Sequence, residues 1–399
     1  MNRTKLLTGI LFSAMLPVTM IVPVIKDVVM DRLGGTSLDS AIFISISMLS
    51  QFLISPVAGY ASDYFQNRNR FITIFLFIDA ALFFLMPITR DVEVLLLLRF
   101  LEGGAHIFVI GLLIASFKDT DAKANETHKG KSLAFAGIAV SLGAAMGLPL
   151  GVLGKSNPYF PFYFGGSILL VLGIVSFFFL RDEEFLVEKK LHFTMLKSAF
   201  SESPYLFVPF ALNFVDRFTV GFITSSLNLH LRGDLGLHPG LVGLAMAFVL
   251  FPMSVLSYPM VLLSRKVGII KLALGGSLVY GIFLGLSGWT TNLWILFPFL
   301  VLTGIGAGVM FVPSLLLASE LSPKNLSATV MSAFTGVGSL GFMLGPIFSV
   351  YLQNLLQSMD TPFSFGILSA IFGSMEIFLV LLFLPLGAGI QKFLSSKQS

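Results

Sequence analysis

Long apolar stretches alternate along the chain with short polar or Gly/Pro-containing breaks. A helix that crosses the hydrocarbon core of a bilayer needs about twenty predominantly apolar residues. Twelve stretches meet this requirement, and we expect membrane-spanning helices over residues 5–30, 39–62, 71–89, 92–117, 130–153, 159–180, 204–231, 237–263, 268–289, 292–319, 325–352 and 362–388. The pattern therefore predicts an all-α integral membrane protein.

The longest polar interruption, residues 181–203, falls near the midpoint of the chain. It predicts a cytoplasmic linker between two bundles of six helices, over residues 1–180 and 204–388, with a cytoplasmic tail at 389–399. The halves also match each other, because residues 103–117 align without gaps to residues 306–320, with seven of fifteen positions identical. Such repetition is typical of transporters built from two parallel six-helix repeats.

Composition and charge agree with a membrane protein and suggest its orientation. Hydrophobic residues make up 55% of the chain and charged residues 12%, against about a quarter charged in soluble domains. Most of the 25 lysines and arginines lie in loops on the face of the N-terminus, and those expected on the other face are Lys26, Arg32, Arg90, Lys155 and Arg232. The positive-inside rule then places both termini in the cytoplasm. The first apolar stretch has no cleavage pattern, so we expect a retained helix rather than a signal peptide.

Several classes of function are disfavoured by what the sequence lacks. There is no cysteine, which excludes disulfides and thiolate metal sites. No phosphate-binding lysine loop, HExxH motif or nucleophile elbow occurs, so we expect no enzyme activity, no metal and no cofactor. We also expect a monomer with no nucleic-acid partner. Without a nucleotide-binding domain, an ion gradient is the expected energy source.

A charged segment, GYASDYFQNRNRF at residues 59–71, separates the second and third apolar stretches. Gly59 allows a neighbouring helix to approach, and Asp63 stands at the membrane boundary, where a carboxylate can face a helix N-terminus. Arg68 and Arg70 would hold the cytoplasmic face, although these two arginines could also simply follow the positive-inside rule. The segment predicts a cytoplasmic gate.

This segment resembles the signature of the major facilitator superfamily of secondary transporters. Gly59, Asp63, Arg68 and Phe71 match the signature, and the departures are Tyr64 and Gln66. The resemblance extends over the whole chain, because the number of spans and the central linker also agree. It implies two pseudo-symmetric six-helix bundles around a central cavity. It also implies that the charged segment latches the two halves together on the cytoplasmic side, by contact with the helix that begins near residues 322–327.

The fourth stretch carries charged groups in its apolar interior. Arg99, Glu102 and His106 stand at i, i+3 and i+7, which places them on one helix face. An ionised group at the bilayer centre costs about 2.5 to 3.5 kcal/mol, so such groups face cavities or partners. Because His and a buried Glu can exchange protons near neutral pH, the cluster predicts a proton-coupling site. The alternative is a static Arg99–Glu102 pair, with His106 bonded to a backbone carbonyl. Arg99 and Gly103 also match a helix-4 motif of the superfamily, in which Glu102 replaces the usual glutamine.

The seventh stretch holds Asp216 and Arg217, which must point about 100° apart on a helix. One of them is expected to face the cavity and the other a different helix, and the family resemblance places this helix at the central cavity. Two further acids, Asp79 and Glu376, fall in helices that are peripheral in the family. For these two we expect a structural role in a protonated or hydrogen-bonded state.

Small residues recur in the fifth and eleventh stretches. They resemble a glycine-proline motif associated with antiport in the superfamily, but ordinary helix packing explains them equally well. The residues are Gly143, Gly147, Pro149, Gly151, Gly341, Gly345 and Pro346.

We therefore predict a secondary active transporter in a bacterial inner membrane that works by alternating access. The proton gradient would drive efflux of a small amphipathic or drug-like solute, since the chain contains 42 phenylalanines and 16 methionines. Two alternatives remain open. The first is proton-coupled uptake of a small polar metabolite, and the second is a non-transporting sensor or a lipid scramblase on the same fold.

Overall fold

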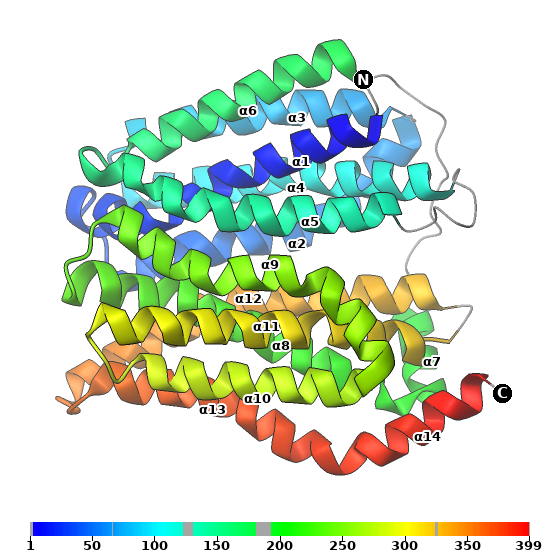
Figure 1. The fold of residues 1–399 in the computed structure, drawn as a ribbon. Helices are drawn as coiled ribbons and strands as arrows, with labels where there is room; N and C mark the ends of the chain where they lie inside the picture. The colour runs from blue at the N-terminus through cyan, green and yellow to red at the C-terminus, as the bar shows by residue number, and fades with distance from the viewer. Residues whose placement is uncertain (1–2, 66, 123–130, 181–192, 324–325, 399) are drawn as a thin grey trace. The chain divides into compact units, whose positions relative to one another are not determined.

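The computed structural model describes residues 3–65, 67–122, 131–180, 193–323 and 326–398 (Figure 1). Within these ranges the secondary structure is helical, without a strand. Twelve of the described helical segments are long and apolar enough to cross a membrane. The prediction of an all-α protein with twelve spans is confirmed.

The chain divides into two compact units, of which the first contains Met1–Glu188 and Asn228–Ala247. In this unit α1 packs on α5 and α6, α2 packs on α4, and α3 packs on both α4 and α6. The helices are α1 (Arg3–Met20), α2 (Ser37–Phe65), α3 (Arg68–Leu85), α4 (Val92–Ala122), α5 (Lys131–Gly147) and α6 (Phe160–Phe179). A 3₁₀ segment, Leu148–Lys155, continues α5.

The second unit contains Lys189–Leu227 and Phe248–Ser399. Its packing repeats that of the first unit, because α8 packs on α12 as α1 does on α5, and α10 packs on α11 and α13 as α3 does on α4 and α6. The helices are α7 (Phe193–Glu202), α8 (Phe207–Phe222), α9 (Pro239–Val267), α10 (Ile269–Ser287), α11 (Leu293–Leu321), α12 (Ser327–Ser358), α13 (Ser364–Phe383) and α14 (Gly387–Gln398). The first part of α9 belongs to the first unit.

The glycines of the fifth and eleventh spans lie where helices cross. A Cβ atom at Gly147 would lie 2.7 Å from the carbonyl oxygen of Leu16 on α1, and one at Gly341 would collide with the carbonyl oxygen of Phe214 on α8. Only glycine allows such approach of two backbones. The same holds for Gly143 and Gly345, whereas Gly151 lies against the Pro23 side chain. Pro149 stands near the start of the 3₁₀ segment, and Pro346 lies inside α12 against Gly221. The two units thus use one packing device at equivalent crossings.

The structure adds details that hydropathy does not reveal. The segment predicted as a linker, residues 181–203, contains α7, whose Ala199 is buried in the core of the second unit. The predicted tail contains most of α14. The single span expected over residues 204–231 is divided into α8 and two π-helical segments, Ile223–Leu227 and His230–Asp234. Short or polar helices escape a search for long apolar runs, because their amphipathic faces lower the mean hydropathy.

The segment after α8 is tied to the end of α1 within the first unit. Asn228 Nδ2 donates to the carbonyl oxygen of Val22 at 2.6 Å. Arg232 forms an ion pair with Asp27, with Nη2 and Oδ1 2.7 Å apart and Nε donating to Oδ2 at 2.9 Å. Burial raises the pKa of Asp27 above its usual value, although the Arg232 guanidinium opposes this shift.

Candidate functional site

Three charged or titratable side chains on α4 are buried together in the first unit. Arg99 is 3% exposed, Glu102 is 0% and His106 is 3%. Arg99 Nη1 donates to Glu102 Oε2 at 2.5 Å, and the guanidinium lies 5.0 Å from the centre of the Phe43 ring on α2. The i, i+3 spacing therefore produces a direct ion pair in the interior of the unit.

His106 finds its partner on a different helix. Its Nδ1 lies 2.9 Å from Oδ2 of Asp79 on α3, and the Asp79 side chain is fully buried. Asp79 Oδ1 and His106 Nε2 have no hydrogen-bond partner among the described residues. Asp79, which the sequence suggested to be structural, is thus part of the same cluster, and the only signal for it was an acid inside an apolar stretch.

Close packing of α2 on α4 buries the cluster. A Cβ atom at Gly103 would lie 2.8 Å from the Cα atom of Ser47 on α2, so this position accepts no side chain. Gly103 follows Glu102 directly and keeps the two backbones in contact beside the ion pair.

The charges of this cluster depend on the protonation of His106 and Asp79. Arg99 can neutralise Glu102, and the remaining pair is neutral when both nitrogens of His106 are protonated or when Asp79 itself is protonated. Ligand atoms of Asp79, Glu102 and His106 also lie within 4.8 Å of one another, a spacing compatible with a bound cation. The Arg99 guanidinium already contacts one carboxylate oxygen of Glu102, however, and places a positive charge at this spot.

A second group of buried polar residues lies in the second unit around Asp216 of α8. Asp216 is 2% exposed, and neither carboxylate oxygen has a hydrogen-bond partner among the described residues. Arg217 Nε lies 3.5 Å from Asp216 Oδ2, while its guanidinium stacks 4.5 Å from the Phe311 ring centre on α11. The adjacent residues therefore have different surroundings, as their 100° separation on the helix requires.

Glu376 of α13 belongs to the same group. Its side chain is fully buried, and Oε2 accepts a hydrogen bond from Ser277 Oγ of α10 at 2.6 Å. Tyr280 OH lies 2.9 Å from Oγ1 of Thr219, which is three residues after Asp216 on α8. Helices α8, α10 and α13 thus bring two acids together that the sequence alone did not connect.

The expected cytoplasmic gate is described only in part. The surroundings of Gly59 and the side chain of Asp63 lie outside what the structure describes, as do residues 324 and 325 of the expected partner segment. Arg68 is the first residue of α3 and is buried, whereas Arg70 is exposed. Asn67 caps this helix, with its Oδ1 accepting from the Arg70 backbone N–H at 3.2 Å.

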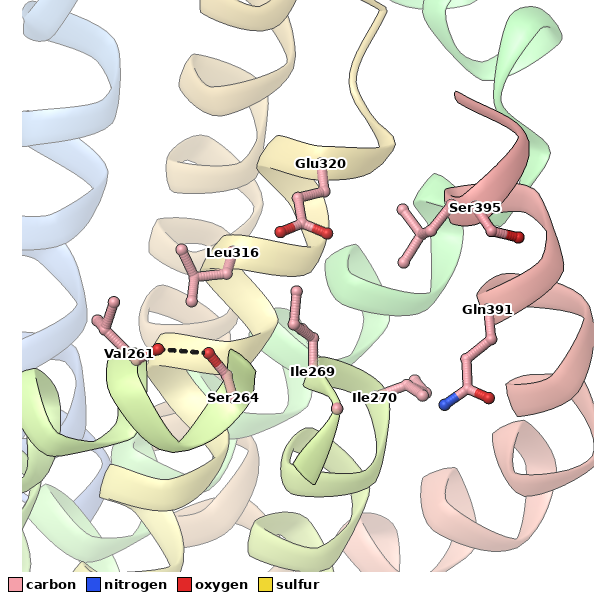
Figure 2. A pocket seen from close by; sticks show the side chains of 10 residues that line it. Val261, Ser264, Ile269, Ile270, Leu316, Glu320, Gln391 and Ser395 are labelled. Carbon is pink, nitrogen blue, oxygen red and sulfur yellow. Dashed lines mark hydrogen bonds between the residues drawn. The ribbon is translucent and has the colours of Figure 1, made fainter. Parts of the chain in front are cut away.

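A cavity of about 450 Å³ lies in the second unit at the ends of α9, α10 and α11, beside α14 (Figure 2). Polar groups of Glu320, Gln391 and Ser395 line it, and Ser264 Oγ donates to the carbonyl oxygen of Val261 at 2.8 Å in its wall. None of the buried acids described above lines this cavity, so it is a feature separate from both clusters.

Twelve membrane-crossing helices in two units with repeated packing, and charged groups buried among them, define a multi-pass membrane protein of the transporter class. The chain matches the Major Facilitator Superfamily over residues 7–215 and 209–398, and it belongs to this family. The resemblance found in the sequence is confirmed.

Relatives and solved structures agree with this assignment. Multidrug resistance protein 1 of Bacillus subtilis is 29% identical over 184 residues, which is 45% of this chain and 45% of that protein. An uncharacterized MFS-type transporter, MJ1560, of Methanocaldococcus jannaschii is 24% identical over 360 residues, 86% of this chain and 89% of the relative. The crystal structure of the nucleoside transporter NupG superposes with a TM-score of 0.75 at 14% identity, covering 96% of this chain and 99% of that one, and shows the same fold. The protein is therefore a membrane transporter and not an enzyme.

Proposed function

We propose that the protein is a proton-coupled secondary transporter that exports small amphipathic cations by antiport. The observation that carries this proposal is the buried pair of His106 and Asp79 beside the Arg99–Glu102 ion pair. Buried titratable groups of this kind inside a membrane mark proton pathways. The cluster is neutral when His106 carries its second proton and has one negative charge when that proton leaves.

This change of charge suggests how substrate and proton compete. A net negative charge in an apolar interior is unfavourable unless a cation balances it. The deprotonated, negatively charged cluster therefore binds a cationic substrate. When the cluster takes up a proton it becomes neutral, and the substrate is released. Each ligand then favours its own conformational state, which is the requirement for coupled transport by alternating access.

Two observations support export over import. One curated relative, aligned over 45% of this chain, is named for multidrug resistance. The glycines at the crossings of α5 with α1 and of α12 with α8 resemble the antiport motif of the family. An apolar substrate with one positive charge would match a chain rich in phenylalanine and methionine.

The test uses purified protein in proteoliposomes with an acidic lumen and ethidium as the amphipathic probe. We expect ethidium to accumulate inside as protons leave, and a proton ionophore to abolish the accumulation. In His106→Gln and Asp79→Asn the accumulation ratio should fall about tenfold at a gradient of one pH unit, since each coupled proton contributes about 1.4 kcal/mol per pH unit. Glu93→Gln, an exposed substitution on the same helix, is the matched control and should accumulate like wild type.

Exchange of labelled for unlabelled ethidium without a gradient should persist in both variants, because they lose the proton carried by His106 and Asp79 and keep the transport pathway. Accumulation only with an alkaline lumen would favour proton-coupled uptake and contradict export. Binding of ethidium without any exchange would indicate a sensor and overturn the proposal of transport coupling.

A further inference from the structure

The second unit contains two buried acids and one nearby arginine, which is the same charge arrangement as in the first unit. Asp216 and Glu376 are at most 2% exposed, and Arg217 is the cation beside Asp216. In the first unit Arg99 pairs with Glu102, and His106 pairs with Asp79. Helices α8, α10, α11, α12 and α13 contain no histidine.

The partners of the two acids favour a shared proton. The hydrogen bond from Ser277 to Glu376 Oε2 comes from a neutral hydroxyl, and Glu376 Oε1 has no hydrogen-bond partner among the described residues. Both oxygens of Asp216 also lack a hydrogen bond, and the Arg217 Nε atom is 3.5 Å away. Two ionised carboxylates in an apolar interior with one guanidinium leave an uncompensated negative charge, which is costly.

The other charged or titratable groups of the surrounding helices do not remove this imbalance. Tyr280 on α10 interacts with both acids but is neutral in its usual state. Helix α12 carries no charged residue. Lys271 stands near the start of α10 and Glu320 near the end of α11, away from the middle of these helices.

We propose that Asp216 and Glu376 together bind a second exchangeable proton, so that the transporter couples two protons to each substrate, one in each unit. The inference rests on the proposed proton coupling at His106 and Asp79. The two units would then perform the same task with different chemistry. Histidine carries the proton in the first unit and a carboxyl group carries it in the second.

The number of coupled protons is measurable in proteoliposomes with the membrane potential held at zero. The logarithm of the ethidium accumulation ratio is plotted against the pH gradient, and the slope equals the number of protons exchanged per ethidium. We expect a slope of two for wild type, so that one pH unit gives about a hundredfold accumulation. Glu376→Gln and Asp216→Asn should each reduce the slope to one, since the unit then holds one of these acids and one arginine and has no excess negative charge. Glu320→Gln, at the end of α11, is the matched control and should retain a slope of two.

The outcomes separate this inference from the proposed function. A wild-type slope of one that Glu376→Gln leaves unchanged would overturn the second proton and leave coupling at His106 intact. A wild-type slope of zero would overturn the proposed function, and the second proton with it. If one variant fails to fold, the other variant and the wild-type slope still show whether a second proton is coupled.

Discussion

Replacement of Arg99 by glutamine tests the energetics of the cluster in the first unit. Arg99 and Glu102 are both at most 3% exposed and are joined by a 2.5 Å contact, so removal of the guanidinium leaves a buried carboxylate without its cation. Loss of one partner of a buried pair costs about 3 to 5 kcal/mol, whereas removal of both partners is often nearly neutral. We expect Arg99→Gln to lose this much stability and the double variant Arg99→Gln/Glu102→Gln to recover most of it.

Unfolding by SDS in mixed detergent micelles, followed by far-UV circular dichroism, gives the free energies for this double-mutant cycle. Arg90→Gln is the control, because Arg90 is exposed in the same unit and should change stability by no more than about 0.5 kcal/mol. A double variant as unstable as Arg99→Gln alone would refute the reasoning, because the loss would then come from packing of the arginine stem and not from the unpaired charge.

Two further predictions concern packing and pH. Gly147→Ala should cost about 1 to 3 kcal/mol, because its methyl group would lie 2.7 Å from the Leu16 carbonyl oxygen. Gly137→Ala on the same helix has open space and should gain about 0.5 to 1 kcal/mol in the same unfolding assay; equal effects would contradict the helix crossing. Burial raises the pKa of Asp27 above its usual value of 3.8, so the folded protein binds a proton at Asp27 more tightly than the unfolded chain does. The stability gained from this proton is complete below pH 3.8 and is lost as the pH rises through the folded-state pKa. Asp27→Asn should abolish this loss, and a stability difference from wild type that does not vary with pH would contradict it.

The helices of this protein were predictable because apolar runs of membrane-spanning length are unambiguous in the sequence. Helices α7 and α14 were not, because both are short and polar on one face. The seventh span was predicted as one helix, and its π-helical segment Ile223–Leu227, which packs on α12, was not predicted.

The candidate site was predictable only along single helices. The spacing of Arg99, Glu102 and His106 placed them on one face, and the structure shows the ion pair that this spacing allows. The contact from His106 to Asp79 depends on the rotation of α3 against α4, which helical periodicity does not determine. Glu376 was expected to have a structural role, and its hydrogen bond from Ser277 depends in the same way on the packing of α10 against α13.

The central claim is that substrate and proton exchange at the pair of His106 and Asp79. Its most direct test is the number of protons released when ethidium binds to the purified protein in weakly buffered detergent solution with a pH indicator. Wild type should release protons on binding, and His106→Gln should release one fewer per bound ethidium, with Glu93→Gln unchanged. Ethidium binding that releases no protons, or releases the same number from His106→Gln as from wild type, would contradict the claim.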